Sequence, residues 1–315
     1  LIMKKSIKLN ALLFFIPNVV AAFCSIISLP FLTQKLDLVD FGYFFLCSIL
    51  VNLFGIFTSF GSSYSMARYF HGKNKNDQEI FLTTLSILSA TSGFIICLLL
   101  ALFWNHFIPR VLPEISEIKT NQLYIIFFSI FIYGFQLYVS EILTITRQAF
   151  LFGIFVSSQS VVGALVNIYL ILNYNLGVDT LFYALFASNL VGFTFISLIF
   201  SKYLVLNFDF KLLKKLLLEY KIIVANIFEV FFYFIERNLI NRFIGLEFFA
   251  IFSHSKNYEK ILINTNTAIT RSVTPRALSD FKKYKKFDNC HKANNYIVLF
   301  TFIFCIFFST IGFDF

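Results

Sequence analysis

Charge is what this chain of 315 residues has least of. Only 14% of its residues are charged, against about 25% in an average soluble protein, whereas 58% are hydrophobic and the mean hydropathy is +0.78. A soluble protein of this size cannot bury so much apolar surface, because surface-to-volume scaling limits its interior. The composition therefore excludes a soluble enzyme, a disordered protein and a nucleic-acid module, and it predicts a polytopic membrane protein.

Signatures of catalysis and of bound cofactors are also missing. The sequence contains no GxxxxGK[ST] phosphate loop, and its four histidines form no HExxH or other metal pattern. Its five cysteines show no metal or disulfide spacing, so we expect free thiols. These absences predict a protein that is not an enzyme and holds no metal or cofactor. Any transport would then be driven by an ion gradient, or by supply and removal of the substrate.

Long uncharged runs predict the helices, since a membrane span needs about 20 apolar residues. The expected fold is an all-α, polytopic membrane helix bundle of about nine transmembrane helices. The predicted spans are Ala11–Thr33, Phe41–Ala67, Phe81–Asn105, Asn121–Thr146, Ala149–Asn173, Thr180–Ser201, Ile222–Ile244, Phe248–Val273 and Ala293–Gly312.

Positive charge is distributed unevenly around these spans. Of the 26 basic residues, only Lys35, Arg110 and Lys119 lie in clear loops on the side opposite the N-terminus. Cytoplasmic loops are rich in Lys and Arg, so the N-terminus is predicted to be cytoplasmic, in the inner (cytoplasmic) membrane. The amphipathic stretch Phe210–Lys221 and the basic loop Pro275–His291 are expected to contact lipid headgroups on that side.

A weak internal repeat suggests two lobes. A shift of the sequence by about 208 residues places Asn18 on Asn226 and Arg68 on Arg276, as in transporters built from parallel repeats. The predicted division is a six-helix lobe over residues 1–201, a cytoplasmic amphipathic linker over 202–221, and a partial lobe of three helices over 222–315.

Ionisable residues concentrate in the seventh and eighth predicted spans. Because a charge inside a bilayer is costly, such residues usually face a wet cavity or one another. One interpretation is a partly cationic translocation cavity; the alternative is a set of ion pairs that only fixes helix packing. The substrate-binding candidates are Arg68, Glu236, Arg237, Lys256, Lys260, Arg271 and Asn18, and the ion-coupling candidates are Glu229 and Glu141.

Several short motifs resemble one known family. Pro30–Leu36, read as PFLTQKL, precedes Asp40–Tyr43, read as DFGY, and Met66–Tyr69 reads MARY. Glu236–Arg237 precedes Ile244–Phe252, where the family usually shows G-x-Y and this chain departs with Ala250 and Phe252; Pro275 also matches the family. These residues resemble Wzx-type polysaccharide flippases of the multidrug/oligosaccharidyl-lipid/polysaccharide (MOP) exporter superfamily.

The resemblance implies two six-helix lobes around a cavity, and a flippase that moves an undecaprenyl-pyrophosphate-linked oligosaccharide, an O-antigen or capsule repeat unit, across the membrane by alternating access. Its implied partners are the lipid-linked oligosaccharide, membrane lipids, a polysaccharide polymerase and a chain-length regulator, with no nucleic acid. The alternatives are an ion-coupled small-molecule exporter of the same fold, a membrane-embedded polymerase or glycosyltransferase, and an inactive truncated remnant. Six plus three helices also predict an incomplete second lobe.

Overall fold

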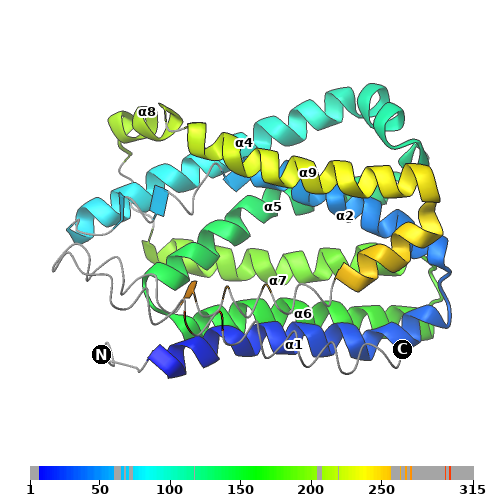
Figure 1. The fold of residues 1–315 in the computed structure, drawn as a ribbon. Helices are drawn as coiled ribbons and strands as arrows, with labels where there is room; N and C mark the ends of the chain where they lie inside the picture. The colour runs from blue at the N-terminus through cyan, green and yellow to red at the C-terminus, as the bar shows by residue number, and fades with distance from the viewer. Residues whose placement is uncertain are drawn as a thin grey trace.

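The computed structural model describes residues 7–59, 65–66, 69–70, 74–116, 118–203, 208–218 and 220–256, with residues 263, 267, 270–271, 295 and 298 (Figure 1). Within this part of the chain every regular element is a helix, which confirms the all-α prediction. The elements are α1 (Ile7–Thr33), α2 (Leu38–Ser59), α4 (Lys75–Val111), the 3₁₀ helix η1 (Pro113–Ile115), α5 (Thr120–Ile145), α6 (Ala149–Asn173), α7 (Asp179–Tyr203), α8 (Phe210–Leu218) and α9 (Tyr220–Ile244). Beyond Gly245, whose φ is +110°, residues 246–256 are again helical.

Six of these helices are long and apolar enough to cross a membrane. They contain the spans Leu12–Thr33, Leu38–Ser59, Asn76–Val111, Thr120–Ile145, Ala149–Asn173 and Asp179–Ser201. Large apolar side chains such as Phe94, Leu102 and Leu198 lie on their outer faces and are more than half exposed, as a lipid environment requires. The chain is a multi-pass membrane protein.

Most observed helix bounds lie within four residues of the predicted ones, and the larger differences are in α2 and α4. The predicted second span continues to Ala67, whereas the structure describes α2 as far as Ser59, and α4 begins at Lys75, six residues before the predicted start at Phe81. The prediction for α6 is exact at both ends, whereas α4 has 37 residues and extends to Val111, six residues past the predicted end at Asn105. Ile108 lies in the extension and is 1% exposed, packed with Leu112 and Ile115 in the largest apolar core. Burial of this residue continues the helix through Pro109, a position that sequence reasoning assigned to a loop.

The helices pack around α5, which contacts α2, α4, α6 and α7. Helix α1 packs along α6, which packs on α7, while α9 packs on α2 and α8 on α4. In Figure 1, α4, α2 and α9 form one side of the bundle, α1 and α6 the other, and α5 and α7 lie between them. The end of the bundle that carries α8 also carries the start of α1; we call it the α8 end, and the opposite end the η1 end.

Helix α8 corresponds to the amphipathic linker predicted from the sequence. Leu212 and Leu216 are buried against Leu82, Leu85 and neighbouring apolar residues, while Lys211 and Lys214 are exposed. The alternation of Leu and Lys at helical spacing thus fixes one face of α8 to the bundle. The division of the chain into lobes at residues 201 and 222 stays a prediction.

A polar network holds the helices together at the η1 end. The Tyr43 hydroxyl donates to Gln122 Oε1 at 2.9 Å, and Gln122 Nε2 donates to Asp179 Oδ1 at 2.5 Å, which links α2, α5 and α7. Asn241 Nδ2 of α9 donates to Glu114 Oε1 of η1 at 2.8 Å. These bonds join α9 to the first six spans and fix the ends of the helices that enclose the cavity described next.

A neutral polar cavity inside the bundle

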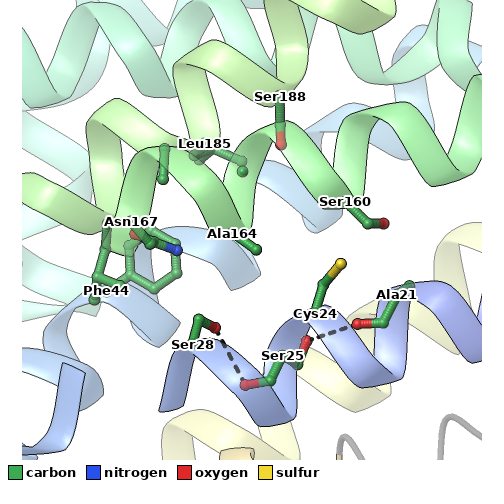
Figure 2. Close-up of a pocket in the computed structure, with 13 residues that line it drawn as sticks. Ala21, Cys24, Ser25, Ser28, Phe44, Ser160, Ala164, Asn167, Leu185 and Ser188 are labelled. Atoms are coloured by element: carbon green, nitrogen blue, oxygen red, sulfur yellow. Dashed lines mark hydrogen bonds between the residues drawn. The ribbon is translucent and has the colours of Figure 1, made fainter. Parts of the chain in front are cut away.

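A cavity of about 240 Å³ lies among α1, α6 and α7 and is closed on one side by Phe44 of α2. We call it the first chamber (Figure 2). Its polar lining comes from hydroxyl, thiol and amide side chains: Cys24, Ser25, Ser28, Ser160, Asn167 and Ser188. Ser25 is exposed, so the first chamber is reached from the protein surface.

A second chamber of about 320 Å³ lies beside the first, among α2, α5, α6 and α7. Ser160, Leu185 and Ser188 line both chambers, so the two form one polar interior. The second chamber is lined mainly by carboxamides and hydroxyls: Ser48, Asn52, Ser129, Gln136, Gln159 and Asn189.

Helical spacing brings these side chains to one place. On α6, Ser160, Gly163 and Asn167 recur at three and four residues and so share one face; on α7, Ala184 and Ser188 do the same. A Cβ on Gly163 would lie 2.6 Å from Ser188 Oγ. Glycine at this position therefore leaves room for the Ser188 hydroxyl where α6 and α7 meet.

Each serine hydroxyl of the first chamber donates its single hydrogen bond to a backbone carbonyl. Ser25 donates to the carbonyl of Ala21, Ser28 to that of Ser25, Ser160 to that of Val156 and Ser188 to that of Gln159, at 2.6 to 3.2 Å. A backbone carbonyl can only accept, so the direction of each bond is fixed. Each hydroxyl is left with acceptor lone pairs to offer to the chamber.

Asn167 adds a further acceptor. Its Oδ1 atom is buried and has no hydrogen-bond partner in the part of the chain that the structure describes. A buried carbonyl oxygen that lacks a partner is costly unless a ligand or water supplies a donor. Figure 2 shows the Asn167 side chain reaching from α6 toward the space between α6 and α1.

The second chamber contains a network of neutral amides. Gln136 Nε2 donates to Gln159 Oε1 at 3.2 Å and to Asn189 Oδ1 at 3.1 Å, which uses both of its protons. Asn189 Nδ2 donates to Ser129 Oγ at 2.7 Å. The Gln159 Nε2 protons and the Gln136 Oε1 atom make no hydrogen bond to other described groups, so this chamber offers both donors and acceptors.

Of the described residues that line the two chambers, none is charged. The combination of hydroxyls, amides and apolar walls inside six membrane spans suits an uncharged ligand with many hydrogen-bonding groups. An ionised ligand would lose its hydration there without meeting an opposite charge.

The residues predicted from the sequence lie largely outside these chambers. Asn18 of α1 is half-buried and donates to the Phe14 carbonyl at 3.2 Å. On α9, Glu236 is exposed and Arg237 half-buried. Lys256 lies 5.5 Å from the centroid of the Phe252 ring, one turn earlier on its own helix.

Two of the predicted residues do come together, from opposite parts of the chain. Arg271 lies over the buried ring of Phe152, with its Cζ atom 4.8 Å from the ring centroid, and it interacts electrostatically with Glu141 of α5. Phe152 in turn packs edge-on against Phe14, with the ring centroids 5.1 Å apart. A cation from beyond α9 is thereby docked on the first six spans near the α8 end.

Three other candidate residues stay predictions. Arg68 and Lys260 lie outside the described residues, as does the side chain of Glu229, whose backbone belongs to α9. All the predicted site residues except Asn18 are charged, and charge gives no indication of the neutral chambers. A usable signal was present in the helical spacing of Ser160, Asn167 and Ser188 and in the carboxamides Gln136, Gln159 and Asn189 within otherwise apolar runs.

Comparisons with known proteins agree with a transporter fold. Residues 31–312 match the sequence family described as "Polysaccharide biosynthesis protein". The crystal structure of a point mutant of the MATE transporter VcmN from Vibrio cholerae aligns with a TM-score of 0.62 at 12% identity, and the alignment covers 93% of this chain and 70% of that one. A crystal structure of a MATE protein in complex with Br-NRF gives a TM-score of 0.62 at 17% identity, with 98% and 75% covered. At these identities the likeness shows the fold alone. No curated protein sequence matches this chain significantly.

Proposed function

The chain belongs to the family of polysaccharide biosynthesis proteins within the MOP exporter superfamily, and we propose that it is a flippase for a lipid-linked oligosaccharide. The substrate we propose is an undecaprenyl-pyrophosphate-linked repeat unit, moved across the inner membrane with the N-terminus of the chain on the cytoplasmic side. Membership of the family confirms the resemblance seen in the sequence, and the family and its structural neighbours are transporters rather than enzymes.

The observation that carries this proposal is a polar interior lined by membrane spans in a member of this family. The hydrocarbon core of a bilayer opposes the passage of a sugar headgroup, because each of its hydroxyls would lose its hydrogen bonds to water. The two chambers supply hydrogen-bonding groups at membrane depth, while the outer faces of the same helices stay apolar. Such a path lets the headgroup cross while the polyprenyl tail stays in lipid.

The pyrophosphate requires positive charge, which the chambers do not offer among their described residues. Arg237, Lys256 and Arg271 are the described cations that we propose for this role, since an arginine fork matches phosphate geometry. Arg271 is held between Phe152 and Glu141, on the first six spans, although it belongs to the segment beyond α9. We propose that this contact opens and closes as the two parts of the protein alternate.

Reconstitution into liposomes tests the function. A fluorescent undecaprenyl-pyrophosphate oligosaccharide is placed in both leaflets, and a membrane-impermeant reagent then destroys the outer pool. The flippase proposal predicts that the protein makes the inner pool reachable, whereas empty liposomes protect it. Protein-dependent export of a small dye with no movement of the lipid would favour the small-molecule exporter, and elongated glycan products would favour a polymerase.

A further inference from the structure

The hydrogen-bonding pattern of the chambers favours uncharged ligands over anionic ones. Four serine hydroxyls of the first chamber already donate their protons to backbone carbonyls, and Asn167 Oδ1 is a buried oxygen without a described donor. The lining of the first chamber therefore offers mainly acceptors, beside the Asn167 amide protons and the Cys24 thiol as donors. A neutral sugar supplies a donor at each hydroxyl, whereas a carboxylate or phosphate supplies only acceptors.

The second chamber favours the same class. Its free groups include the Gln159 Nε2 protons and the Gln136 Oε1 atom, a donor and an acceptor that neutral hydroxyl or acetamido groups satisfy together. An anion could accept from Gln159, but it would be buried without a cation among the described lining residues. A volume of about 320 Å³ lies at the lower end of the range of small-molecule sites, about 300–1,000 Å³.

We propose that the two chambers form a binding site for the uncharged sugar units of the substrate, with Asn167 as a specificity-determining residue that selects hydroxyl donors against anionic sugars. The site thus admits neutral hexose or N-acetylhexosamine units and rejects uronate units, and the pyrophosphate is held elsewhere. The identity of the sugar as part of a lipid-linked substrate rests on the proposed function; the charge selectivity of the chambers does not.

Cys24 provides a direct readout of occupancy. Its thiol lines the first chamber beside Ser25 and Ser28, and it is half-buried. Figure 2 shows the sulfur pointing from α1 into the space between α1 and α6. With the other four cysteines replaced by alanine, the rate at which a maleimide alkylates Cys24 reports whether the first chamber is filled.

The experiment compares matched probes on the full-length protein in detergent. A panel of neutral methyl hexosides and N-acetylhexosaminides is tested against methyl glucuronide and methyl galacturonide, which replace the C6 hydroxymethyl group by a carboxylate. At a concentration about four times the dissociation constant, a neutral sugar should slow alkylation about fivefold, since one chamber in five stays empty. The uronides should not slow it.

The Asn167→Leu variant tests the specificity determinant. This substitution removes the unpartnered oxygen at similar volume, so the protein should fold and the protection by neutral sugars should fall about tenfold in affinity, the effect of losing one good buried hydrogen bond of about 1.4 kcal/mol. Asn173→Leu, on the same helix with its amide on the Tyr169 carbonyl outside both chambers, is the matched control and should keep full protection. If Asn167→Leu fails to fold, Gly163→Ala, which narrows the chamber at Ser188, takes its place.

Several outcomes would overturn the proposal: no protection by any neutral sugar, equal protection by the uronides, protection by sodium chloride alone, or full protection in Asn167→Leu. Protection of Cys24 with no movement of the lipid-linked substrate in liposomes would leave the chamber site standing and remove the flippase. Lipid movement without protection of Cys24 would do the reverse.

Discussion

The first six spans and the segment from α9 onward differ in the kind of polar side chain that they carry. Around the two chambers of the first six spans the polar side chains are neutral, and most of them bond to one another or to the backbone, as in the network of Gln136, Gln159 and Asn189. The segment from α9 onward carries ionisable groups instead, among them Glu236, Arg237 and Lys256. Neutral amides and hydroxyls can be enclosed at low cost once their hydrogen bonds are made, whereas ions need water, headgroups or each other.

This contrast suggests that the two regions of the protein bind different parts of one substrate. The neutral region fits the uncharged sugars, and the charged segment fits the pyrophosphate. The two regions interact electrostatically through Arg271 and Glu141. The two regions should also respond differently to substitution, because the first depends on tight packing and the second on contacts that must be able to open.

The largest effect is expected at Gly134, inside the neutral region. A Cβ added there would collide with Thr58 Oγ1 and lie 2.7 Å from the Thr58 carbonyl carbon, so α5 and α2 could not keep their approach. Gly134→Ala should reduce the stability of the protein by about 3 kcal/mol, the upper part of the usual range for overpacking. Thermal unfolding in detergent measures this. Gly153→Ala, where the nearest atom would be Pro17 Cγ at 3.6 Å, is the control and should unfold close to the wild-type temperature.

A smaller effect is expected at Gly42, where the two regions touch. Its Cβ would lie 2.5 Å from the backbone oxygen of Leu246, just beyond Gly245. Gly42→Ala should push residues 246–256 away from α2 at a cost of about 1–2 kcal/mol, because this segment can shift without unpacking the bundle. Limited proteolysis should then cleave after α9 faster while the first six spans stay protected. Equal loss of protection in both regions would show that they do not move independently.

The contact between Arg271 and Phe152 should contribute less to the stability of the protein than the packing at Gly134 or Gly42. Its stacking on Phe152 is expected to contribute about 0.5–2 kcal/mol. A double-mutant cycle of Arg271→Ala and Phe152→Leu, read by thermal unfolding, should return a coupling energy in that range. Arg271→Lys keeps the charge near Glu141 but loses the planar stack, so it should recover only part of the stability and of the lipid movement. Additive single-variant effects would mean that the two side chains do not interact.

The smallest effect is expected at Lys119. Its Nζ lies 2.6 Å from Asp179 Oδ2, but its side chain is 59% exposed, so water screens the pair. Lys119→Ala should change stability by about 0–1 kcal/mol. Gln122→Leu removes the hydrogen bonds to the Tyr43 hydroxyl and to the Asp179 carboxylate from a side chain that is 3% exposed, and it should cost about 1–3 kcal/mol. A larger effect of Lys119→Ala than of Gln122→Leu would show that the exposed ion pair contributes more than the buried hydrogen bonds.

Much of the fold was predictable because the apolar runs are long and bounded by charge. Helix α6 was predicted at both ends, and α8 followed from the spacing of Leu and Lys. The extension of α4 was not predictable, since it depends on burial of Ile108 against residues of η1. The chambers escaped prediction for a similar reason: Ser, Asn and Gln at helical spacing fit an outer face, a packing contact or a cavity equally well. Only the pairing of α1, α6 and α7 decides between these possibilities, whereas Glu141 and Arg271 were identifiable because charge inside a span is rare.

We propose that the neutral chambers select uncharged sugars during lipid transport. The most direct test is to measure, in the same proteoliposomes, the rate at which two undecaprenyl-pyrophosphate glycans are moved, identical except that one carries a neutral hexose and the other its uronate. Movement of the neutral form about tenfold faster, which corresponds to about 1.4 kcal/mol of discrimination, is the predicted result, and the difference should shrink in Asn167→Leu. Equal rates for the two glycans, or faster movement of the uronate, would show that the chambers do not select uncharged sugars.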